Sequence, residues 1–187
     1  MKTKLLMIIG PTAVGKSSII DRAIVDYPHL RDIITYTTRP MRSGESEGNP
    51  YHFVSDDKFK ALIEQNFFVE WAIVHGRMYG TPRDQIEQTA GDGRLSIIDV
   101  DVQGAKKLLA EYPGSVTVFL MPPSMDALRQ RFIKRGVTSD EDLAKRLESA
   151  QKELAQAGDF QYRVVNDQLD SAYMEIRKII ENLLKNQ

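Results

Sequence analysis

Short apolar runs alternate along the chain with longer segments in which apolar residues recur every three or four positions. The runs predict buried strands, and the recurrence predicts helices that pack on them. The predicted core strands cover 4–9, 33–37, 95–99, 115–120 and 162–166. The predicted helices cover 15–27, 56–65, 82–90, 101–111, 124–134, 139–157 and 170–187. This alternation favours an α/β fold built on a largely parallel sheet.

Two stretches interrupt the alternation. Residues 39–50 are rich in turn-forming residues, while 51–54 and 67–74 resemble strands of a small separate sheet. Residues 135–142 form a polar, glycine-containing hinge between two predicted helices. We therefore expect one domain with two insertions around a single core.

Composition narrows the class of protein. A chain of 187 residues that is 42% hydrophobic is long enough for one domain with a substantial core. The 25 basic residues nearly balance the 26 acidic residues, which argues against a general binder of nucleic acid or membrane surfaces. The absence of cysteine excludes disulfides and thiolate metal sites. Because no signal-peptide pattern precedes the first strand, we expect a cytoplasmic protein.

The most informative segment is 10–17, which reads GPTAVGKS directly after an apolar run and before a helical pattern. This is the phosphate-binding sequence GxxxxGK[ST] in its required strand–loop–helix context. Gly10 and Gly15 let the backbone turn its N–H groups inward, and the helix start adds a positive dipole end. Lys16 supplies a charge, and the Ser17 hydroxyl is a ligand for Mg²⁺. The segment predicts a site for a nucleoside triphosphate.

A second group of polar residues lies in the turn-rich stretch. Residues 35–45 read TYTTRPMRSGE, and Tyr51 and Tyr79 follow. The guanidinium groups of Arg39 and Arg42 match the oxygens of a dianionic phosphate. Without the preceding phosphate loop, a solvated surface loop would explain these residues better.

A carboxylate lies among the aromatic residues of FFVEWA. Strand alternation places Phe68, Glu70 and Ala72 on one face. A carboxylate in such surroundings accepts two N–H bonds from a guanine edge, which adenine does not offer. The alternative is that Glu70 lies on the solvated face of an antiparallel strand.

The buried run 95–101, LSIIDVD, ends in acids. This pattern places a carboxylate near Mg²⁺ in phosphate-loop proteins. Of these two acids, Asp99 and Asp101, one could serve a metal and the other a substrate. A helix N-cap is an alternative role for Asp101.

Arginines flank the hinge at 135–142. Arg131 and Arg135 lie four residues apart and share one helix face, and Arg129 and Arg146 lie nearby. Arginines carried by a moving segment are suited to stabilising charge on a transferred phosphoryl group. If these residues stood alone, an ordinary solvated helix with salt bridges to Asp140, Glu141 and Asp142 would explain them better.

Taken together, these motifs resemble one family, guanylate kinase. They occur in the family's order and spacing from residue 10 to about 173, nearly the whole chain. The segments that carry the resemblance are GPTAVGKSS, TYTTRPMRSGE, YHFVS, FVEWA, YGTP, IDVDVQGA, RGVTSDEDLAKRL and VVNDQLDSAY.

The resemblance implies a role for each matching residue. The implied GMP-binding residues are Thr35, Arg39, Arg42, Tyr51, Glu70, Tyr79, Thr81 and Asp101. The implied ATP-binding residues are Gly10, Pro11, Thr12, Ala13, Val14, Gly15, Lys16, Ser17, Ser18 and Asn166. The implied catalytic residues, which attend the transferred phosphoryl group, are Lys16, Arg131, Arg135 and Arg146. The implied Mg²⁺ ligands are Ser17 and, through water, Asp99.

The resemblance also implies the architecture: a phosphate-loop NTPase core, a small mixed-sheet GMP-binding region and a helical lid. The expected boundaries are 1–34, 82–123 and 157–187 for the core, 35–81 for the GMP-binding region and 124–156 for the lid.

The implied activity is ATP-dependent phosphorylation of GMP, and of dGMP as a further expected substrate, in purine nucleotide metabolism. Mg²⁺ is the implied cofactor, and the expected assembly is a monomer or small homo-oligomer that binds neither nucleic acid nor membrane. Two alternatives stay open. One is an inactive module of the same fold that binds phosphopeptides, and the other is a kinase of the same fold for a phosphorylated sugar.

Overall fold

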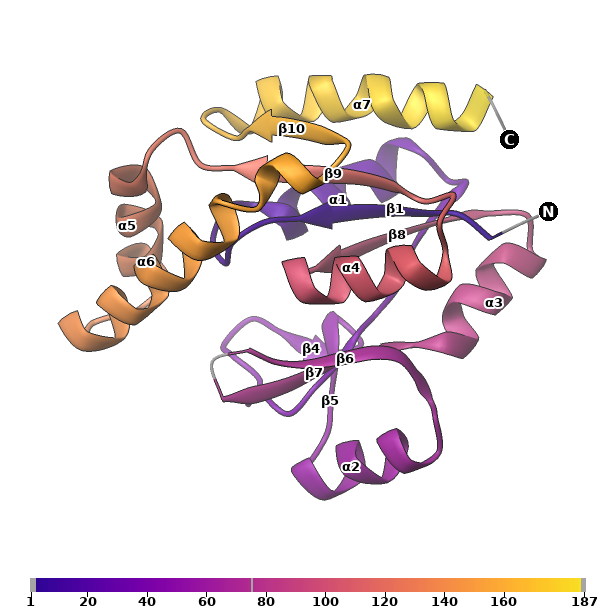
Figure 1. The fold of residues 1–187 in the computed structure, drawn as a ribbon, viewed down its shortest axis with the longest axis horizontal. Helices are drawn as coiled ribbons and strands as arrows, with labels where there is room; N and C mark the ends of the chain where they lie inside the picture. Colours follow the sequence, from indigo (N-terminus) through magenta and orange to yellow (C-terminus); the bar gives the residue numbers. More distant parts are fainter. Residues whose placement is uncertain (1–2, 75, 186–187) are drawn as a thin grey trace.

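A five-stranded parallel sheet occupies the centre of the computed structural model, which describes residues 3–74 and 76–185 (Figure 1). Its strands lie in the order β10 (Tyr162–Val165), β9 (Val116–Met121), β1 (Leu5–Ile9), β8 (Leu95–Val100) and β2 (Leu30–Asp32). The predicted parallel core is therefore confirmed. Ligands bind at the carboxyl ends of such strands, which is where the loop after β1 lies.

Helices cover both faces of this sheet (Figure 1). They are α1 (Lys16–Asp26) and α7 (Leu169–Lys185) on one face, and α3 (Arg83–Gly91) and α4 (Val102–Glu111) on the other. The side chains of β1 alternate between the two faces. Leu6 and Ile8 pack in the cluster with α1 and α7, whereas Leu5, Met7 and Ile9 pack in the cluster with α3 and α4. Because both faces are covered, every residue of β1 is apolar and buried.

A second, mixed sheet lies beside the core and carries α2 (Asp56–Glu64). Its strands lie in the order β4 (Ser46–Glu47), β5 (Pro50–Phe53), β3 (Tyr36–Thr37), β7 (Arg77–Pro82) and β6 (Phe68–Val74). Strand β3 pairs parallel with β5 and antiparallel with β7. The stacked rings of Phe59 and Phe68, with centroids 4.6 Å apart, join α2 to this sheet. The small separate sheet is confirmed, although the sequence pattern did not predict β4 and β7.

Two helices, α5 (Met125–Lys134) and α6 (Asp140–Leu154), project from the carboxyl end of the core sheet (Figure 1). Each begins at a serine that caps its first turn, Ser124 for α5 and Ser139 for α6. Leu128 and Phe132 of α5 pack in one apolar cluster with Leu143 of α6. Ala13 of the phosphate loop belongs to the same cluster, which couples this helix pair to the loop.

The prediction of a core strand at 33–37 is wrong. The core strand is Leu30–Asp32, whereas Tyr36–Thr37 pairs with strands of the second sheet. Strand β2 lies at the sheet edge, where polar residues are tolerated, and only Leu30 of its three residues is buried. With one buried apolar residue, β2 lacks the apolar run that would indicate a core strand.

The first five helices differ from their predicted ranges by at most one residue at each end, and the sixth differs more. The helix predicted over 139–157 ends at Leu154 and is followed by a short 3₁₀ turn, Ala157–Asp159. The helix predicted over 170–187 covers Leu169–Lys185, and residues 186–187 lie outside the described part of the chain. Within residues 3–74 and 76–185, no helix combines the length and apolar character needed to cross a membrane.

Candidate active site

The phosphate loop leaves β1 with backbone angles that favour glycine. Gly10 has φ +142° and Gly15 has φ +108°, and a Cβ at Gly10 would overlap the carbonyl of Leu120. Ala13 also has a positive φ, +67°. Helix α1 starts at Lys16, and Gly15 at its N-cap provides no side-chain hydrogen bond. The first N–H groups of α1 are thus placed to meet an anion.

Lys16 lies over this loop. Its Nζ donates to the carbonyl oxygens of Gly10 at 2.5 Å and Pro11 at 3.2 Å. The same Nζ lies 3.5 Å from Oδ1 of Asp99, which is the next-to-last residue of β8. Burial raises the pKa of Asp99, and the Lys16 charge opposes that rise. One ammonium group therefore links the loop to the neighbouring strand.

A small cavity of about 30 Å³ lies beside the start of α1. Its polar lining includes Ser17 and Asp99, the two predicted Mg²⁺ ligands, together with Asp21 and Asp32. Hydroxyl and carboxylate oxygens suit Mg²⁺, which takes one or two protein groups and completes its shell with water and phosphate. The residues therefore fit the ion, although no three acids or histidines among the described residues form a ready cage.

Sequence reasoning missed Asp21 and Asp32 at this cavity. Burial and, to a smaller extent, the charges of Asp99 and Asp21 raise the pKa of Asp32 to about 7. The position of Asp32 at the carboxyl end of a parallel strand could have indicated its place in the site. The apolar pattern, however, predicted this strand at 33–37 instead of Leu30–Asp32.

The predicted phosphate-binding arginines lie in a turn held by Glu45. Arg39 donates to both oxygens of Glu45, at 3.0 and 2.8 Å, and the backbone N–H of Arg42 donates to the same carboxylate at 2.8 Å. The Arg39 guanidinium also lies 5.4 Å from the ring centroids of Tyr51 and Phe53. Glu45 is the last residue of the segment 35–45, but the sequence did not predict that it is the partner of these arginines.

Two phenols lie beside this turn. The rings of Tyr51 and Tyr79 meet edge to face, with centroids 5.7 Å apart. Burial raises the pKa of Tyr51, so its hydroxyl stays protonated and is able to donate a hydrogen bond. Thr35 is buried and lines the 30 Å³ cavity together with Tyr51. Four of the predicted GMP-binding residues therefore lie close to one another: Thr35, Arg39, Tyr51 and Tyr79.

The predicted base-reading residues bring a buried carboxylate, Glu70, together with a buried hydroxyl, Thr81, and a half-buried carboxylate, Asp101. Glu70 is only 8% exposed, which excludes a solvated strand face, and its Oε1 accepts a 2.6 Å hydrogen bond from Thr81. Asp101 caps α4 by accepting from the N–H of Gly104 at 2.7 Å. A Cβ at Gly104 would lie 3.0 Å from Glu70 and 3.2 Å from Asp101, so a glycine there leaves room for both carboxylates.

The electrostatics of this pair favour a proton on Glu70. The pKa of Glu70 is raised to about 7: burial raises it most, the Thr81 hydrogen bond opposes the rise, and the Asp101 charge adds to it. A ligand that presents N–H donors to Glu70 would therefore supply what the site lacks. The Thr81 hydroxyl has one hydrogen, and in this structure it donates that hydrogen in a hydrogen bond to Glu70.

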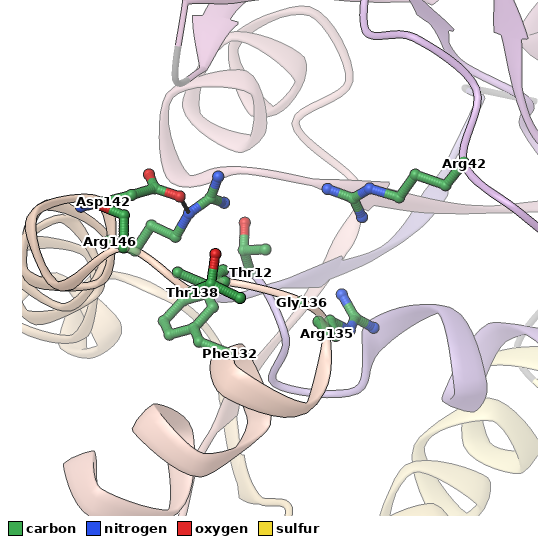
Figure 2. Close-up of a pocket in the computed structure, with 10 residues that line it drawn as sticks. Thr12, Arg42, Phe132, Arg135, Gly136, Thr138, Asp142 and Arg146 are labelled. Atoms are coloured by element: carbon green, nitrogen blue, oxygen red, sulfur yellow. Dashed lines mark hydrogen bonds and ion pairs between the residues drawn. The ribbon is translucent and has the colours of Figure 1, made fainter.

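A larger cavity of about 260 Å³ joins three parts of the chain (Figure 2). Thr12 comes from the phosphate loop, Arg42 from the arginine turn, and Arg135 and Arg146 from the α5–α6 segment. Arg146 is held by Asp142 through a 3.0 Å contact, and the Arg42 guanidinium extends toward the cavity from the other side (Figure 2). Three cations converge on one space, which suits a polyphosphate. The remaining lining residues are Phe132, Gly136, Val137, Thr138 and Ser139.

The other predicted ATP-binding and catalytic residues lie behind the phosphate loop or beside it. Arg131 donates to the carbonyl oxygens of Val14, at 3.1 Å, and Asn166, at 2.7 Å. The side chain of Asn166 donates to the same Val14 carbonyl at 2.8 Å. Pro11 and Val14 are buried, and Ser18 is exposed on α1.

Comparison with known proteins agrees with this geometry. The family model described as guanylate kinase matches residues 2–183. The chain belongs to the guanylate kinase family. A guanylate kinase of Bdellovibrio bacteriovorus is 40% identical over 184 residues, covering 98% of this chain and 100% of that protein. A guanylate kinase of Symbiobacterium thermophilum is 41% identical over 179 residues, covering 96% of this chain and 85% of that protein.

A solved member of the family has the same fold. The crystal structure of guanylate kinase from Anaplasma phagocytophilum superposes with a TM-score of 0.79 at 27% identity, covering 97% of this chain and 87% of that one. Membership in the guanylate kinase family thus agrees with the parallel core, the second sheet and the phosphate loop.

Proposed function

We propose that this protein transfers the γ-phosphoryl group of ATP to GMP, giving ADP and GDP. The observation that carries the proposal is the 260 Å³ cavity, where the phosphate loop, the arginine turn and the α5–α6 arginines meet. A phosphoryl donor on the loop and a phosphate acceptor on the turn would face each other across this space. The guanylate kinases that the chain resembles at about 40% identity support the same reaction.

The second sheet holds GMP in this proposal. Arg39 and Arg42 bind the phosphate with help from the hydroxyls of Tyr51 and Tyr79, and Thr35 lies nearby. The guanine base reaches the two acids, Glu70 and Asp101. Glu70 accepts from N1–H and the 2-amino group, Asp101 assists it, and the Thr81 hydroxyl turns from Glu70 to donate to O6.

The core holds ATP. Its phosphates lie in the loop 10–17 against the backbone N–H groups and the helix start, and Asn166 lies beside the adenine. Mg²⁺, when bound with ATP, neutralises phosphate charge. Ser17 would hold it directly, and Asp99 would hold it through water.

The side chains that act on the transferred group are Lys16, Arg135 and Arg146, which supply positive charge where negative charge develops. The attacking GMP phosphate oxygen is already ionised at neutral pH, so the reaction needs no general base. For Arg146 to reach the phosphoryl group, it has to exchange its Asp142 contact for the substrate.

Motion is part of the proposal. Residues 35–81 form the GMP-binding region and 124–156 form the lid, and both close on a core of 1–34, 82–123 and 157–187. We infer a cytoplasmic enzyme of purine nucleotide metabolism, active as a monomer or small homo-oligomer, that also accepts dGMP. The intact Lys16 and Ser17 and the buried Glu70 favour this activity over a phosphopeptide-binding module and over a sugar-phosphate kinase.

The test is a substrate panel. ADP release is measured with MgATP and each of GMP, dGMP, AMP, CMP, UMP and ribose 5-phosphate. The proposal requires kcat/KM for GMP to be about tenfold to several hundredfold higher than for AMP, CMP and UMP. This ratio corresponds to the free-energy cost of leaving a buried polar group unpaired. Equal turnover of the four ribonucleotides, or release only with the sugar phosphate, would refute the proposal.

A further inference from the structure

Arg131 donates hydrogen bonds to two backbone carbonyls, whereas Arg42, Arg135 and Arg146 line the 260 Å³ cavity. We propose that Arg131 is a positioning residue for the phosphate loop: with Asn166 it holds the Val14 carbonyl and so aims the Gly15 N–H at the bound phosphates. This inference rests on the proposed function, because it takes the loop to be the phosphate site.

The contacts form a closed network behind the loop. The Val14 carbonyl accepts two hydrogen bonds, from Nη1 of Arg131 at 3.1 Å and from Nδ2 of Asn166 at 2.8 Å. The second guanidinium nitrogen of Arg131 donates to the Asn166 carbonyl at 2.7 Å. Asn166 is itself fixed, because it is 5% exposed and its N–H donates to Met121 at 2.7 Å. Each member therefore restrains the others.

The geometry of the peptide bond means that holding the Val14 carbonyl also sets the direction of the Gly15 N–H. The carbonyl of Val14 and the N–H of Gly15 belong to one planar trans peptide, in which the two bonds point in opposite directions. Two donors that fix the carbonyl on the Arg131 side therefore fix the N–H on the other side. Backbone N–H groups of this loop are the groups that cradle the α- and β-phosphates.

The local backbone needs such support. Ala13 has φ +67°, a left-handed conformation that is unfavourable for a residue with a Cβ. Gly15 has φ +108°, and a Cβ there would overlap the Asn166 amide nitrogen. Strained backbone of this kind persists only where its surroundings hold it. The Arg131–Asn166 network holds Val14, the residue between Ala13 and Gly15.

Arg135 provides the matched comparison. It lies four residues after Arg131, and its side chain lines the cavity together with Thr12 and Arg146 (Figure 2). If Arg131 acted on the transferred γ-phosphoryl group, the two arginines would share one kinetic phenotype. If Arg131 acts through the loop, its loss weakens ligands that carry only α- and β-phosphates.

The experiment compares Arg131→Met with Arg135→Met in the full-length protein. ADP affinity is measured by calorimetry, and kcat is measured with saturating MgATP and GMP. We expect Arg131→Met to weaken ADP by about tenfold or more, the scale of a lost charged hydrogen bond, and Arg135→Met to change ADP affinity less than about twofold while lowering kcat. Wild-type ADP affinity in a folded Arg131→Met variant, with kcat reduced, would overturn the inference.

Further variants keep the inference testable if Arg131→Met fails to fold. Arg131→Lys keeps the positive charge but has one donor nitrogen in place of two, so this variant should bind ADP with intermediate affinity. Asn166→Asp places a carboxylate against the Val14 carbonyl and should weaken inorganic tripolyphosphate, a probe without a base, although Arg131 is intact. The amide resonance of Gly15 should shift in both variants before any ligand is added. Unchanged tripolyphosphate affinity and an unchanged Gly15 resonance would overturn the inference.

The outcomes also separate the inference from the proposed function. A wild-type protein that binds ADP but does not phosphorylate GMP refutes the proposed function and leaves the loop experiment informative. A wild-type protein that binds neither ADP nor tripolyphosphate refutes the assignment of the loop, and the inference about Arg131 is overturned with it.

Discussion

Replacing Glu70 by glutamine should remove the preference for guanine. Glu70 is buried and offers two acceptor oxygens, of which Oε1 already accepts from Thr81. Guanine presents N1–H and the 2-amino group as adjacent donors, whereas adenine presents an unprotonated N1. Glutamine keeps the shape of the side chain but places a donor against a donor. A mismatch of this kind costs about 1–3 kcal/mol, so kcat/KM for GMP should fall by roughly tenfold to several hundredfold.

The raised pKa adds a pH signature to this prediction. Because the pKa of Glu70 is about 7 in the free protein, the carboxylate that accepts the guanine N–H groups is formed only as pH rises toward 7. GMP affinity should therefore increase by about tenfold between pH 6 and 8. The ratio of wild-type to Glu70→Gln affinity isolates this effect, because the phosphate of GMP titrates equally with both proteins.

The same shift predicts an opposite effect on stability. Between pH 4.5 and about 7 the folded protein holds a proton on Glu70 that the unfolded chain has released, so stability falls as pH rises through this window. The shift corresponds to about 3 kcal/mol. Glu70→Gln should therefore raise the free energy of unfolding at pH 8 by up to that amount and leave it nearly unchanged at pH 4.5.

Calorimetry with GMP, AMP and ATP at pH 6 and 8 provides the assay, with urea unfolding at the same pH values and at pH 4.5. The reasoning is refuted if Glu70→Gln retains the preference for GMP over AMP, or if ATP binding weakens as much as GMP binding. A wild-type to variant ratio that does not change with pH would refute the proposed protonation of Glu70.

Three other perturbations have defined outcomes. Lys16→Ala should lower turnover by at least about a hundredfold in a variant that still folds, because it removes charge from the cleft and keeps helix propensity; near-normal turnover would contradict the loop assignment. Glu45→Gln, which weakens the bidentate hold on Arg39, should raise KM for GMP severalfold and leave KM for ATP unchanged, as steady-state kinetics would show; equal changes in both would point to misfolding. GMP with a non-hydrolysable ATP analogue should reduce the radius of gyration in small-angle scattering, because each ligand bridges the core and a mobile region; identical profiles would count against the lid at 124–156.

The sequence predicts the core well because its signals are local. An apolar run followed by GPTAVGKS defines β1, the loop and the start of α1, and covered strand faces require continuous apolar runs. The alternation that placed Phe68, Glu70 and Ala72 on one face is confirmed by their burial. Asp101 does cap α4, as its position before a helix suggested.

The failures of sequence reasoning concern partners that are distant in the chain or weakly apolar. Strand β2 was misplaced because Arg31 and Asp32 carry no apolar signal at a sheet edge. The contact of Arg131 with Val14 spans 117 positions, and no local pattern reveals which of several clustered arginines will meet a backbone carbonyl. Such pairings depend on how α5 docks on the loop, which only the folded structure shows.

The most direct test of the proposed activity follows the phosphoryl group itself. The protein is incubated with Mg²⁺, GMP and ATP labelled in the γ-phosphate, and the nucleotides are separated and counted. We expect label to leave ATP and to appear in GDP in equal amounts, with one ADP formed for each GDP, and Lys16→Ala to form at least about a hundredfold less GDP. Label released as inorganic phosphate in the presence of GMP, or label that stays in ATP, would contradict the proposed activity.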